Sequence, residues 1–137
     1  MILTVRTIIE LMGYPEDHVN KVMENILEKL KKTGGIEIVK KDLAPVEKIK
    51  EKMFSTFVEL EMKFKNIKDL YLFCIDFLPT SIEILDTEEV KFSAIDFTSS
   101  LNEVIAYFHK YNVALHNTQA QLNEVLRKLE KTPTSLK

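Results

Sequence analysis

The sequence has few of the residues that small proteins use as covalent or metal cross-links. Among 137 residues there is one cysteine, Cys74, and there is no tryptophan. A single cysteine excludes an internal disulfide and a metal cluster built from the thiolates of one chain. Three glycines and four prolines are too few for a collagen-like or low-complexity chain. Because 45% of the residues are hydrophobic and 29% are charged, we expect a folded soluble protein with one core.

The chain also lacks a strong charge of one sign and a long apolar run. Nineteen Lys and Arg against 21 Asp and Glu give a net charge of −2, so any nucleic-acid site must be local. The longest apolar cluster, 70–78, contains Asp76 and is far shorter than the roughly 20 residues that cross a bilayer. No basic leader with an apolar stretch opens the sequence. We therefore expect a cytoplasmic protein with no membrane segment.

The first third of the chain predicts two helices. Residues 4–12 begin with a capping threonine and end at Gly13, a pattern typical of a short helix. A second helix is expected from Pro15 to Lys32, because apolar residues recur there at spacings of three and four and a Gly-Gly pair follows.

The middle of the chain predicts strands. The apolar residues alternate with polar ones over 36–41 and 57–65, and a third strand is expected at 81–85. A helix over 67–78 lies between the last two. Strand, helix and strand in this order predict a right-handed βαβ crossover that places 57–65 and 81–85 parallel. A short further strand is expected at 90–92.

The last third predicts one long helix, from about Ala94 to Lys131, because it contains no Gly or Pro. At 1.5 Å per residue such a helix is roughly 57 Å long, more than the width of a domain of this size. Nine of its residues alternate at spacings of four and three, as in a coiled coil. These nine residues, called the seam below, are Leu101, Ile105, Phe108, Asn112, Leu115, Gln119, Leu122, Leu126 and Leu129.

The seam has polar residues at two a-type positions, Asn112 and Gln119, and leucine at the d-type positions that follow them. A buried asparagine at position a fixes the register of a coiled coil and favours dimers, at a cost in stability. Self-association through the seam is therefore the preferred hypothesis. The alternative for the first half of the helix is that it packs on the protein's own sheet.

Lysines are concentrated around the expected strand at 36–41. The order of two short helices and a hairpin resembles a winged helix. Acidic residues on the second expected helix, among them Glu16 and Asp17, oppose contact with phosphates. Nucleic-acid binding is thus an alternative function, and it uses Lys31, Lys32, Lys40, Lys41, Lys48, Lys50 and Lys52.

No group of residues predicts a catalytic or metal site. His109 and His116 are seven residues apart, about 10.5 Å along a helix, which is too far to chelate one ion. Cys74 falls on the apolar face of its helix, where a thiol acts as a small core side chain. The Gly-Gly pair at 34–35 follows a helix, whereas a phosphate-binding loop precedes one. We expect no enzyme activity and no cofactor.

Three segments resemble a group of small, uncharacterised archaeal proteins of α+β type. They are Val58–Phe64, Phe77–Leu85 and the long final helix. The resemblance implies an α+β fold and brings no activity, cofactor or site residue. Residues 57–92 are also similar to the ferredoxin-like ligand-sensing extension of some bacterial transcription regulators, a likeness of fold that does not fix function. The expected architecture suggests a further alternative, a small-ligand-binding regulatory domain with a pocket between sheet and helices.

The sequence as a whole predicts a single α+β domain over 1–131 and a flexible tail over 132–137. The domain is expected to have two N-terminal helices, a three- to four-stranded mixed sheet with a βαβ crossover, and a long C-terminal helix. The predicted function is that of a non-enzymatic interaction or assembly module. Its expected partner is a second copy of the chain, in a homodimer formed by the C-terminal helix, or another protein.

Overall fold

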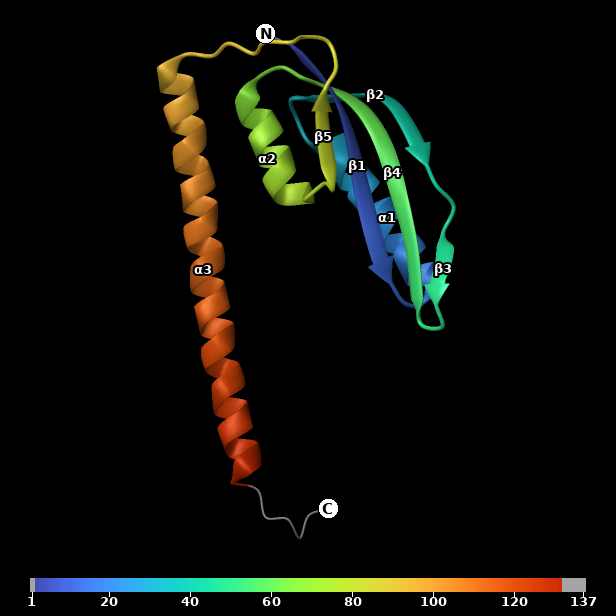
Figure 1. Cartoon of the computed structure of the whole chain (residues 1–137), viewed down its shortest axis with the longest axis vertical. Helices are drawn as coiled ribbons and strands as arrows, with labels where there is room; N and C mark the ends of the chain where they lie inside the picture. Colours follow the sequence, from blue (N-terminus) through green and yellow to red (C-terminus); the bar gives the residue numbers. More distant parts are fainter. Residues whose placement is uncertain (1, 132–137) are drawn as a thin grey trace. The chain divides into compact units, whose positions relative to one another are not determined.

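The computed structural model describes residues 2–131 of the chain (Figure 1). These residues form two compact units, one that ends at Ser100 and one that begins at Leu101. The elements follow one another as β1 (Leu3–Gly13), α1 (Glu16–Lys32), β2 (Ile36–Leu43), β3 (Glu47–Lys50), β4 (Met53–Phe64), α2 (Ile67–Phe77), β5 (Ser81–Ile84) and α3 (Ala94–Glu130). The predicted tail lies outside the described residues.

The strands form one antiparallel sheet in the order β2-β4-β1-β5, and β3 pairs with β4. β1 lies between β4 and β5 (Figure 1) and runs antiparallel to both. β4 and β5 therefore point the same way on either side of β1. Leaving β3 aside, a β-α-β-β-α-β order with this split βαβ arrangement is the ferredoxin-like topology.

The prediction of a helix over 4–12 is wrong, because these residues form the central strand β1. Burial along it alternates: Leu3, Val5 and Ile9 are buried, whereas Arg6 and Glu10 are exposed. This period of two is the period of a strand with one covered face. β-Branched residues, which favour strands, make up much of the segment. The chain thus has one N-terminal helix, α1, preceded by a strand.

The sheet also differs from the predicted mixed sheet of three or four strands. It has five strands within the described residues, and every pair is antiparallel. The predicted crossover exists, but β1 separates β4 from β5. Residues 90–92 form no strand. The strands predicted at 36–41, 57–65 and 81–85 are confirmed within slightly different bounds, as are α1, α2 and the long α3.

The hydrophobic core lies between one face of the sheet and the helices α1 and α2. On β4, the alternate residues Val58, Leu60, Met62 and Phe64 are fully buried. The ring of Phe64 lies 5.7 Å from that of Phe73 on α2, measured between centroids. From α1, the core receives Met23, Leu27 and Leu30. The opposite face of the sheet carries polar and charged side chains such as Arg6 and Glu59.

The turn between α1 and β2 depends on one glycine. Gly35 has a φ of +80°, in the left-handed region that a side chain disfavours, and a Cβ there would meet the carboxylate of Asp69. Gly34 has open space around its Cα and no such φ. We expect Gly35→Ala to lower the free energy of unfolding by about 1–2 kcal/mol, measured by urea denaturation. Gly34→Ala is the matched control and is expected to change it by less than about 1 kcal/mol. Equal losses in the two variants would contradict this assignment.

Candidate functional site

The helix α3 runs without interruption from Ala94 to Glu130, so its first turns belong to the first unit and the rest of it makes up the second. It begins where the hydroxyl oxygen of Ser93 accepts a hydrogen bond from the amide of Asp96, at 3.1 Å. The helix continues through Asn112, where its β-branched and polar neighbours weaken helix propensity. With 37 residues it is roughly 55 Å long. The prediction of one long C-terminal helix is confirmed.

All nine residues of the seam lie on α3 with exposed side chains. The seven apolar ones are between 43% exposed, at Leu101, and 70% exposed, at Phe108. Monomeric proteins rarely leave a contiguous apolar stripe of this length in water, and such stripes mark interaction surfaces. The structure therefore brings the predicted interaction residues together on one face of one helix.

Charged side chains are kept away from the seam. When Ile105 is numbered as position a, the e and g positions on either side of the seam hold Asn, His, Val, Tyr and Thr, with a single acid, Glu130, at the C-terminal end. The other charges occupy the outer positions b, c and f. One ion pair joins two of them, Lys128 and Glu124, at 3.6 Å. These outer charged residues are Glu103, Lys110, Glu124, Arg127, Lys128 and Lys131.

The e and g positions flank the seam, and their residue types follow from the sequence once the heptad is assigned. The prediction of the seam rests on the a and d positions alone. In many coiled coils the e and g positions carry charges that select the partner by interhelical ion pairs. On this helix the e and g positions carry almost no charge, with Glu130 the one charged residue among them.

The lysines of the nucleic-acid alternative do not form one patch. Lys31 and Lys32 are in the last turn of α1, a few residues before Ile36, which pairs with Phe64 at the end of β4. Lys50 pairs with Met53 at the other end of β4. Met53 and Phe64 are eleven positions apart along this strand, which is roughly 36 Å at 3.3 Å per residue. The remaining lysines are spread between these ends: Lys40 and Lys41 lie in β2, Lys48 in β3, and Lys52 in the turn before β4.

The open face of the sheet carries acidic residues around a single arginine. The guanidinium of Arg6 lies 3.3 Å from a carboxylate oxygen of Glu59 and 3.3 Å from one of Glu83. Glu61 is paired with Arg6 in register and lies 3.7 Å from the ammonium of Lys40. Because carboxylates repel phosphates, this face opposes a nucleic-acid backbone.

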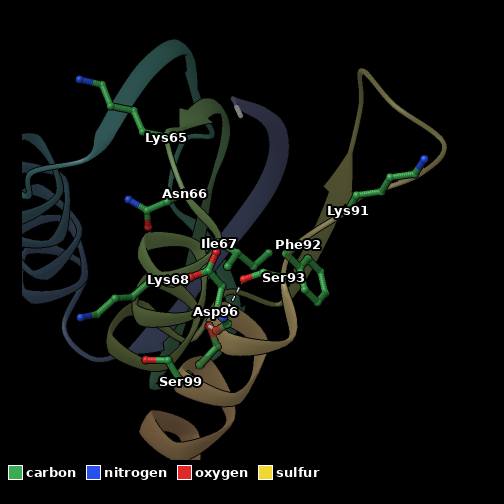
Figure 2. Close-up of a pocket in the computed structure, with 10 residues that line it drawn as sticks. Lys65, Asn66, Ile67, Lys68, Lys91, Phe92, Ser93, Asp96 and Ser99 are labelled. Atoms are coloured by element: carbon green, nitrogen blue, oxygen red, sulfur yellow. Dashed lines mark hydrogen bonds between the residues drawn. The ribbon is translucent and has the colours of Figure 1, made fainter.

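The largest pocket described in the first unit has a volume of about 510 Å³ and lies where the N-terminus of α2 and the first turns of α3 meet (Figure 2). Sequence reasoning does not find it, because its lining comes from two separate segments, 65–68 and 91–100. Three lysines line it, but Figure 2 shows the side chains of Lys65, Lys68 and Lys91 pointing in different directions. The first turn of α3 adds the carboxylate of Asp96. The pocket therefore does not focus positive charge on one point.

The lone thiol and the potential metal ligands of the described residues are the remaining chemically reactive groups. Cys74 is half-buried on α2, and desolvation by burial raises the pKa of its thiol. A raised pKa lowers the fraction of the nucleophilic thiolate at neutral pH. Within residues 2–131, no three His, Cys, Asp or Glu side chains are grouped so that they could hold a metal ion. None of the helices in the same range is both long and apolar enough to cross a membrane.

Comparison with known proteins gives one relative and a family. The chain is 26% identical over 111 residues to "Uncharacterized protein MJ0538" from Methanocaldococcus jannaschii, and the match covers 80% of this chain and 42% of the relative. The chain thus spans less than half the length of that relative. No solved structure matches the chain. The MJ0538 family matches residues 4–133, which confirms the resemblance to uncharacterised archaeal proteins. This chain belongs to the MJ0538 family.

Proposed function

We propose that this protein is a non-enzymatic assembly module in which α3 pairs with α3 of a second copy. The observation that carries the proposal is the exposure of the seam, with seven apolar side chains that are 43–70% exposed on one face of α3. Full burial of one such side chain lowers the free energy by about 1.5–3 kcal/mol relative to its exposure to water. Two copies bury twice this set, which favours association once the entropy of two free chains is offset.

The chemistry of the flanks makes a second copy a suitable partner. A heterologous partner of opposite charge needs a charged surface to recognise, and the seam has only Glu130 beside it. Two identical seams meet as apolar surface against apolar surface, with the charged positions b, c and f away from the interface. The proposal includes a cytoplasmic location, where the lone thiol of Cys74 stays reduced.

The mass of the intact chain in solution tests this function. We expect sedimentation velocity at micromolar concentration to give twice the 15.9 kDa of one chain, with dissociation on dilution. A mass of one chain at high micromolar concentration would overturn the proposed function.

A further inference from the structure

We infer that the two α3 helices pair in parallel and in register, so that Asn112 faces Asn112 and Gln119 faces Gln119 of the second copy. This inference rests on the proposed function, since it concerns the geometry of the same homodimer. It goes beyond that function because dimerisation alone leaves the orientation and the register open.

The positions of the two amides decide the orientation. In a parallel pair, each a residue meets the same a residue of its partner and each d residue meets the same d residue. In an antiparallel pair, a residues meet d residues instead. Both polar residues of the seam are at position a, and every d position holds an apolar side chain. The d residues are Leu101, Phe108, Leu115, Leu122 and Leu129.

An antiparallel pair would therefore place each amide against leucine or phenylalanine. A buried amide with no hydrogen-bond partner is costly, whereas an amide that faces a second amide exchanges hydrogen bonds with it. Only the parallel arrangement offers Asn112 and Gln119 such partners across the interface. The e and g positions are uncharged apart from Glu130, so they impose no competing preference through ion pairs.

The same amides decide the register. A shift by one heptad in a parallel pair brings Asn112 opposite Gln119, which is acceptable. It also brings Ile105 opposite Asn112 and Gln119 opposite Leu126, and these two layers each bury an amide against an aliphatic side chain. The unshifted register is the one in which polar layers meet polar layers and apolar layers meet apolar layers.

The side chain of Gln119 is already oriented within one helix. Its Nε2 donates a hydrogen bond to Oδ1 of Asn123, one turn further on, at 3.1 Å. An amide nitrogen carries two hydrogens and the amide oxygen accepts bonds of its own. Gln119 can thus keep its bond to Asn123 and still exchange hydrogen bonds with Gln119 of the second copy.

Disulfide trapping tests the orientation. In a Cys74→Ser background, one chain carries Leu101→Cys and another carries Leu129→Cys, at opposite ends of the seam. Equal d positions of a parallel pair lie close enough for a disulfide. We expect each variant alone to form a disulfide-linked dimer when oxidised with glutathione, at least roughly tenfold faster than Asn117→Cys on the outer face. A mixture of the two variants is expected to form only disulfides between like chains.

The outcomes separate the orientation from the function, because sedimentation of the reduced variants is measured in parallel. In an antiparallel pair Leu101 meets an a residue near the far end of its partner, such as Leu126, and does not meet Leu129. Reduced dimers that link in a mixture of Leu101→Cys and Leu126→Cys chains, while neither Leu101→Cys nor Leu129→Cys links alone, would show an antiparallel pair and overturn this inference. Reduced dimers that form no disulfide, either between like chains or between unlike chains, would also overturn the inferred orientation, while the proposed function stands. Reduced chains that are all monomeric, like the unchanged chain, would overturn the proposed function itself.

Discussion

A chain that carries Leu122→Glu and Leu126→Glu is expected to sediment as a monomer at concentrations where the unchanged chain is a dimer. Both leucines are about half exposed on α3, at 50% and 48%, and belong to consecutive layers of the seam. The dimer would lose four buried leucines, and the burial of each contributes about 1 kcal/mol to the free energy of association at this exposure. It would also place four carboxylates together in a desolvated interface, which costs more. The dissociation constant is therefore expected to rise by at least roughly a thousandfold.

The control for this variant has the same charges at the same spacing on the outer face. Asn117→Glu and Gln121→Glu place two carboxylates four residues apart at positions f and c, where the side chains are exposed. We expect this chain to remain dimeric with an unchanged circular dichroism spectrum. Equal dissociation of both variants would show that added negative charge, rather than loss of the seam, breaks the dimer. Two dimeric variants would show that the seam is not the interface.

A chain that carries Phe64→Ala is expected to lose about 3–5 kcal/mol of its free energy of unfolding. Phe64 is 0% exposed. It lies at the end of β4 between Leu3 of β1 and Ile36 of β2, with which it pairs in register. Its ring also packs against Phe73, so truncation leaves a cavity between the sheet and α2. Against a typical domain stability of about 5–15 kcal/mol, this loss is a large part of the total. Urea denaturation followed by circular dichroism measures it.

Phe57→Ala is the matched control for the core variant. Phe57 lies on the same strand but is 45% exposed on the opposite face of the sheet. Its truncation removes less buried surface and leaves no enclosed cavity, so we expect a loss of less than about 1.5 kcal/mol. Comparable losses at the two positions would contradict the assignment of the core to the helix-covered face.

The elements that the sequence predicts well are those whose pattern is local. The alternation over Val58–Phe64 and the apolar spacing within α1 suffice for a strand and a helix, and both are confirmed. β1 is different, because Thr4 and Gly13 satisfy the rules for a short helix while its apolar residues fit either period. The choice is made by pairing with β4 and β5. Every partner residue on these strands is more than forty residues away in the sequence, and a local pattern carries no information about such partners.

The candidate surface follows from sequence more completely than the sheet does. A heptad repeat is a local pattern, and it places all nine seam residues on one face of α3 without knowledge of any other element. The lysines of 31–52 show the opposite case. They are close in sequence, but the antiparallel path of β2 and β3 along β4 spreads them from one end of the sheet to the other. Lysines that are close in sequence therefore lie far apart in space when the chain between them is extended, and they do not form one surface patch.

The central position of β1 has a consequence for synthesis on the ribosome. Leu3 pairs with Phe64, and Val5 pairs with Ile84, so β1 is synthesised well before either of the strands that pair with it. At about 5–20 residues per second, the wait for the β4 partner of Leu3 is roughly 3–12 s. During this interval an apolar, β-branched segment has no strand beside it. The nascent chain must therefore keep β1 from aggregating until β4 has been translated.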